Sequence, residues 1–152
     1  MLKTLSGAAV LFGLAWTVHT ADHARRGVDA TSDAVVWSGT AVAMLAAVTI
    51  TLVVVRHPLA PALSAVVFLA VAIGVSASHL LPDWGVLSDP ILVDSASDNW
   101  SVVAVGLEIV AAAWLGIVAT TILRRNNFAL HVDPDRWEPT SATVAKDARL
   151  YP

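Results

Sequence analysis

Two histidines near residue 20 have the spacing that brings two nitrogen ligands to one ion. They are His19 and His23, with Asp22 between them and Arg26 one helical turn further on. On a helix, residues separated by three and four positions lie on one narrow face. Two imidazoles on such a face can bind the same metal ion, and the carboxylate can ligate that ion or orient an imidazole.

Three further ionisable residues are candidates for the same site. His79 ends an apolar run, and Asp83 follows it by four residues, although Pro82 stands between them. Glu108 lies inside another apolar run, where a carboxylate is costly unless it is protonated or has a partner. We therefore expect Glu108 to face the interior of a helix bundle.

Four apolar runs must bring these residues together, and each is about as long as a bilayer is thick. A helix needs about 20 residues to cross the hydrocarbon of a membrane. The runs cover residues 2–20, 34–55, 61–81 and 100–123. We predict an all-α fold, an integral membrane four-helix up-down bundle with short loops in residues 1–125. Residues 126–152 are polar and are predicted to form a flexible cytoplasmic tail.

The up-down order predicts that the candidate ligands meet. Consecutive spans alternate in direction, so the ends of the first and third spans share a membrane face with the starts of the second and fourth. The predicted metal site on that face consists of His19, Asp22, His23, His79, Asp83 and Glu108.

The composition limits what the site can bind. The chain is 57% hydrophobic and 14% charged, below the roughly 25% charged residues of soluble domains. Its net charge of −3 argues against nucleic acid as a partner. It has no cysteine, so a metal would need imidazole and carboxylate ligands, which suit Zn, Cu or Fe. Haem b is the other cofactor considered, with His79 pairing across the bundle with His19 or His23.

The orientation follows from the basic residues, which favour the cytoplasmic side. Most lie on the side opposite the histidines: Lys3, Arg56, Arg124, Arg125, Arg136, Lys146 and Arg149. We therefore predict a multi-pass protein of the cell membrane with both termini in the cytoplasm. Arg25 and Arg26, on the histidine side, could pair with Asp22 or Asp29, and we predict instead that they anchor the interface. The third connection carries Asp83, Asp89, Asp94 and Asp98, and is predicted to be a solvated loop.

Three functions remain open at this point. The first is a metal or haem site at the outer interface of the membrane, for redox, metal or proton handling. The second is an accessory, structural subunit of a larger membrane complex or a homo-oligomer embedded in the lipid bilayer. The third is an integral membrane hydrolase of a lipid-like substrate. It would use Ser76 or Ser78 beside His79 and Asp83, or a metal-activated water beside Glu108.

Overall fold

Helices make up all the regular structure in the described part of the chain. The computed structural model describes residues 2–27, 31–93 and 97–132. The helices are α1 (Leu2–Arg26), α2 (Asp33–Val54), α3 (Ala60–Leu80) and α4 (Asn99–Val132). All four are long and apolar enough to cross a membrane. The all-α prediction is therefore confirmed.

Two helices extend well beyond their predicted ends. Helix α1 continues past Thr20 to Arg26. The candidate residues of this segment therefore all lie on the helix, namely His19, Asp22, His23 and Arg26. Helix α4 continues past Leu123 to Val132, into the segment predicted as tail. The second and third helices differ from the predicted runs by a single residue at either end. Residues 133–152 of the predicted tail lie outside the described residues.

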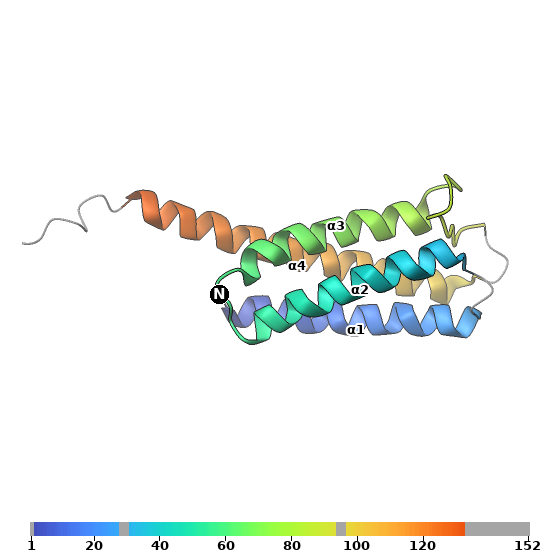
Figure 1. Ribbon diagram of the computed structural model, residues 1–152, viewed down its shortest axis with the longest axis horizontal. Helices are drawn as coiled ribbons and strands as arrows, with labels where there is room; N and C mark the ends of the chain where they lie inside the picture. The colour runs from blue at the N-terminus through green and yellow to red at the C-terminus, as the bar shows by residue number, and fades with distance from the viewer. Residues whose placement is uncertain (1, 28–30, 94–96, 133–152) are drawn as a thin grey trace, which may run out of the picture.

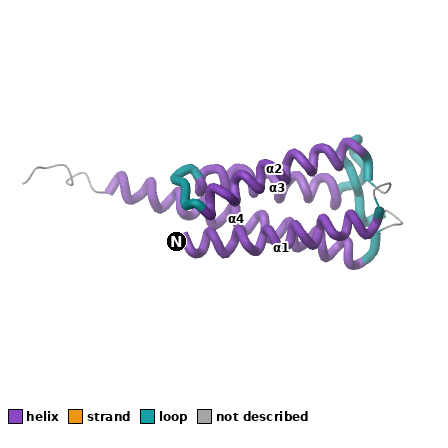
Figure 2. Tube along the Cα trace, turned by 60° about the horizontal axis from the view of Figure 1, so that its bottom comes forward, coloured by secondary structure: helices purple, strands orange, loops and turns teal. Residues whose placement is uncertain are grey.

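The order of the helices places the ends of α1 and α3 together. Successive helices run in opposite directions along the bundle (Figure 1). The connections that follow α1 and α3 lie at the same end of the molecule (Figure 2). The C-terminal turns of α1 and α3, which carry the candidate histidines, therefore meet the start of α4.

Helix α4 packs most closely, against α3 on one side and α1 on the other. The buried core includes Phe12 of α1 and Phe68 of α3, whose rings meet edge to face at 4.6 Å between centroids. A Cβ atom at Gly116 of α4 would lie 2.7 Å from Cγ of Leu69. The absence of a side chain at Gly116 thus permits the close approach of α3 and α4.

Side-chain caps fix the starts of two helices. The hydroxyl of Ser32 accepts a hydrogen bond from the backbone N–H of Val35 at the start of α2. The carboxylate of Asp98 accepts from the backbone N–H groups of Trp100 and Ser101 at the start of α4. The bond from Ser101, aided by the charge of Arg25, lowers the pKa of Asp98 below 3.8. Asp98 therefore stabilises the fold above pH 3.8 and loses this contribution as the pH falls through its lowered pKa.

Candidate metal centre

Three histidine side chains meet at the end of the bundle. His19 and His23 are one turn apart on α1, and His79 lies in the last turn of α3. Their ring centroids are separated by 4.7, 4.9 and 5.5 Å. His19 is 6% exposed and His79 is 4% exposed, whereas His23 is partly buried. One ring nitrogen from each histidine lies within 4.8 Å of the other two, so the three can hold a metal ion.

Two of the imidazoles have one nitrogen engaged and the other available. Nδ1 of His19 hydrogen-bonds to the buried carboxylate of Glu108 on α4. Nδ1 of His79 donates to the backbone carbonyl of Asp89 at 3.0 Å. In a neutral imidazole whose Nδ1 carries the proton, Nε2 is an acceptor and a metal ligand. Nε2 of His19 is buried and has no hydrogen-bond partner among the described residues.

Glu108 occupies the position that a carboxylate takes beside many metal-binding histidines. A histidine ligand usually donates its other ring N–H to a carboxylate or carbonyl, which fixes its tautomer and orientation. Glu108 does this for His19, and the carbonyl of Asp89 does it for His79. The predicted inward orientation of Glu108 is confirmed by its burial, with 4% of its surface exposed.

A chain of ion pairs surrounds the histidines. Asp22 is buried and binds the guanidinium of Arg25 at 2.8 Å. Its other oxygen lies 3.4 Å from Nε of Arg26, which pairs in turn with Asp89 at 3.0 Å. Arg25 also reaches Asp98 at 2.9 Å. These pairs join the end of α1 to the loop after α3 and to the start of α4.

The loop in residues 82–93 folds back on the end of α3 and carries Asp89 into the cluster. The backbone N–H of Asp89 donates to the carbonyl of Ser78 at 2.9 Å. The backbone N–H of Ile91 donates to the carbonyl of His79 at 3.1 Å. Both the backbone and the ring of His79 are thus held by this loop.

The structure places Asp83 and Arg26 differently from the sequence prediction. Asp83 is exposed, and its carboxylate accepts a hydrogen bond from the backbone N–H of Gly85. The carboxylate nearest His79 is instead that of Asp89, at 3.4 Å from Nδ1. The side chain of Arg26 is fully buried rather than anchored at the interface, because Asp22 and Asp89 neutralise it inside the cluster.

The serines of α3 do not form a catalytic pair with His79. The hydroxyl of Ser76 donates to the carbonyl of Ala72 at 2.7 Å, and that of Ser78 donates to the carbonyl of Leu87 at 2.7 Å. Nδ1 of His79 faces Asp89 instead. These contacts leave the serine form of the hydrolase alternative without a nucleophile in hydrogen-bond contact with its histidine.

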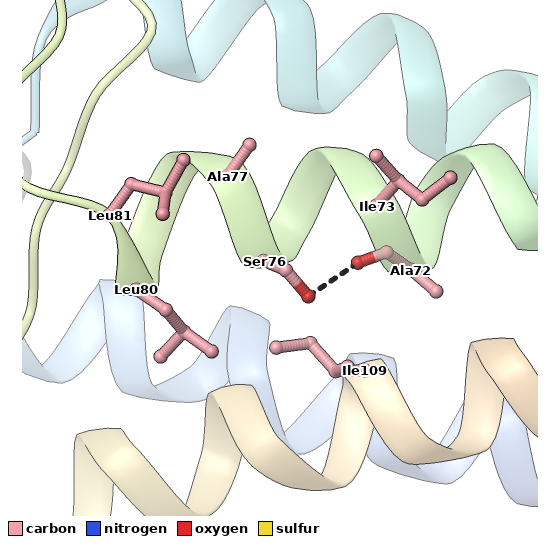
Figure 3. Close-up of a pocket in the computed structure, with 7 residues that line it drawn as sticks. All are labelled: Ala72, Ile73, Ser76, Ala77, Leu80, Leu81 and Ile109. Atoms are coloured by element: carbon pink, nitrogen blue, oxygen red, sulfur yellow. Dashed lines mark hydrogen bonds between the residues drawn. The ribbon is translucent and has the colours of Figure 1, made fainter.

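An open apolar hollow of about 520 Å³ lies between α3 and α4 (Figure 3). Its single polar lining side chain is Ser76, whose hydroxyl is already bonded to Ala72. The residues that line the hollow are Ala72, Ile73, Ser76, Ala77, Leu80, Leu81 and Ile109. The hollow therefore offers an apolar surface rather than a reactive site.

The donor set of the histidine cluster favours a bare ion over haem. Imidazole nitrogen is a common ligand of zinc, copper, iron and nickel. The rings of His19 and His79 are in edge contact, with centroids 4.9 Å apart, so no porphyrin plane fits between them.

Comparisons with protein families, curated proteins and solved structures find no match for this chain.

Proposed function

We propose that this chain is a small multi-pass membrane protein that binds one divalent transition-metal cation through His19, His23 and His79. The observation that carries this proposal is the convergence of three imidazoles, two of them held at Nδ1 by partners that leave Nε2 for the ion. The ligands come from α1 and α3, and Glu108 of α4 orients His19.

A location in the cell membrane is supported by the surface of the bundle. Large aliphatic side chains are exposed along the helices, including Leu14, Val48 and Ile73, and lipid would cover such a surface. Trp37 and Trp84 are exposed beside the loops at the histidine end, which suits a membrane–water interface. With the basic residues on the cytoplasmic side, both termini are inside and the histidine cluster faces outward.

Zn²⁺ is the cation that these ligands suit best. It binds neutral imidazole readily, and sites with three protein ligands leave a fourth, open position for water or a passing ligand. The absence of cysteine removes the thiolates that soft ions such as Cu⁺ prefer. An open position permits exchange, so we propose that the site takes up and releases the ion rather than serving only to stabilise the fold.

The charges around the histidines also favour a divalent cation. The ion-pair chain and Glu108 supply four carboxylates, whereas the arginines supply two guanidinium groups. With neutral imidazoles and ionised carboxylates, these groups have a net charge of −2, which a divalent cation neutralises. The carboxylates are Asp22, Asp89, Asp98 and Glu108.

The full chain, purified in detergent and stripped of metal, tests the proposal. We expect it to bind one Zn²⁺ per chain by calorimetry, and to give the intense visible absorption of four-coordinate cobalt when loaded with Co²⁺. The variant His57→Ala is the matched control, because His57 is exposed in the turn between α2 and α3 at the other end of the bundle. A chain that retains no stoichiometric Zn²⁺ contradicts the proposal.

The variant Glu108→Gln is expected to weaken Zn²⁺ binding by about 10- to 100-fold, the usual effect of removing an orienting carboxylate. The glutamine carbonyl can still accept the proton of His19 Nδ1, but it supplies no negative charge. Calorimetric titration with Zn²⁺ measures the change. Asp83→Asn removes an exposed carboxylate and is expected to leave the affinity unchanged. Equal affinities for the two variants would show that the negative charge of Glu108 does not strengthen Zn²⁺ binding.

A further inference from the structure

Arg26 is placed where it competes with a metal ion for His23. Its side chain is fully buried. Its Nη2 lies 3.0 Å from Nδ1 of His23 and 3.0 Å from Oδ2 of Asp89. A guanidinium thus stands beside one of the three proposed ligands.

This contact determines the tautomer of His23. Arginine carries only hydrogen-bond donors and stays protonated in proteins. Nδ1 of His23 must therefore accept, and the proton of the neutral ring resides on Nε2. In this state Nδ1 is blocked by Arg26 and Nε2 by its own proton, so neither nitrogen of His23 can bind a cation. His19 and His79 have the opposite tautomer, since their Nδ1 atoms face Glu108 and a carbonyl.

We infer that Arg26 is an internal competitor that regulates the metal site, an inference that rests on the proposed function. Without the ion, Arg26 holds His23 in the tautomer that cannot bind. When the ion binds, Arg26 leaves His23 and keeps its ion pairs with Asp22 and Asp89.

The number of protons on His23 does not change in this exchange. As the ion binds Nε2, the proton of Nε2 is lost there and one is taken up at Nδ1, so the ring stays neutral. Two acceptors lie near Nδ1 for that proton, Oγ1 of Thr31 at 3.3 Å and Oδ2 of Asp89 at 3.9 Å. His19 and His79 thus form a permanent pair of ligands, and His23 is a conditional third.

The variant Arg26→Met tests the inference, with Arg25→Met as its matched control. Both variants remove one positive charge beside Asp22, but within the described residues Arg25 contacts Asp22, Asp98 and Ser101 rather than a histidine. We expect Arg26→Met to bind Zn²⁺ about tenfold more tightly than the wild-type chain, because a hydrogen bond from a charged group no longer has to be broken. We expect Arg25→Met to differ from wild type by less than about threefold, since its exposed charge is screened by solvent.

Calorimetry with Zn²⁺ separates the possible failures. Equal or weaker binding by a folded Arg26→Met chain overturns the role of Arg26 but leaves the metal site intact. If neither the wild-type chain nor Arg26→Met binds Zn²⁺, the proposed function itself fails.

A second measurement on the wild-type chain covers the case in which Arg26→Met does not fold. Imidazole ¹⁵N spectra of the metal-free protein are expected to show the Nε2–H tautomer at His23 and the Nδ1–H tautomer at His19 and His79. Addition of Zn²⁺ is expected to convert His23 to the Nδ1–H form. An Nδ1–H tautomer at His23 in the metal-free protein would overturn the inference.

Discussion

His79→Asn is expected to bind Zn²⁺ at least about 100-fold more weakly than the wild-type chain. Structural zinc sites bind with about 10 kcal/mol or more, so each of three imidazoles contributes about 3 kcal/mol, and each 1.4 kcal/mol is a factor of about ten in affinity. In this variant the asparagine amide nitrogen would stand near the place of Nδ1 and donate to the carbonyl of Asp89, but the new side chain provides no equivalent of Nε2. Calorimetric titration of both chains in detergent measures the loss.

Two further variants separate loss of a ligand from loss of structure. His79→Gln places a polar group near Nε2 and lacks the donor to Asp89, so it reports the structural cost of breaking that contact. His57→Ala removes an exposed histidine at the other end and is expected to bind like wild type. A His79→Asn chain with unchanged affinity and unchanged helix content would remove His79 from the site.

Asp22→Asn is expected to lower the free energy of unfolding by about 3 kcal/mol. Breaking a buried ion pair by neutralising one partner leaves an uncompensated charge, which costs about 3–5 kcal/mol. Asp22 is 1% exposed by side chain and Arg26 is fully buried. Arg26 keeps its contact with Asp89, so we take the lower end of that range. Unfolding in mixed detergent and sodium dodecyl sulfate measures the change.

Asp33→Asn is the control for this stability experiment. Asp33 lies in the first turn of α2 and is exposed. Its replacement is expected to change the unfolding free energy by less than about 1 kcal/mol, the usual size of an exposed charge at a helix start. Equal destabilisation by the two variants would mean that the pair of Asp22 and Arg26 is worth no more than a surface charge.

The fold follows from the sequence because the length and apolar character of its four runs determine it. Runs of apolar residues long enough to cross a bilayer have little choice but to form helices, since every backbone polar group must be satisfied within the segment. The short connections then force neighbouring helices to run antiparallel. The far end of α4 is less predictable, because the apolar run ends at Leu123 whereas the helix continues through polar residues, and hydropathy marks only the end of the run.

The histidines could be placed together from the sequence, but their surroundings could not. Helical spacing aligns His19 with His23, and the order of the helices brings His79 to the same end. Asp83 and Asp89 both follow α3 in a polar loop, and sequence spacing favours Asp83. The loop folds back through backbone hydrogen bonds to Ser78 and His79, and this brings Asp89 rather than Asp83 beside His79.

The predicted anchoring of Arg26 at the interface is wrong for a related reason, although its pairing with Asp22 was an open alternative. At the end of a span, an arginine usually extends its charged group to water. Its burial depends on Asp22 of its own helix and on Asp89, a residue 63 positions away. No local pattern reveals a partner that the folded loop brings from such a distance.

The sequence separation of the ligands has a consequence for how the protein is made. A ribosome completes α1 and α2 long before it reaches the loop that supplies Asp89 and the helix that supplies Glu108. During that interval the newly made first hairpin carries Asp22 and Arg26 without their later contacts. Synthesis of the third and fourth helices therefore adds Asp89 as the second partner of Arg26 and completes the site. In a truncated chain that ends after α2, Arg26 would have only Asp22 of its own helix as a carboxylate partner.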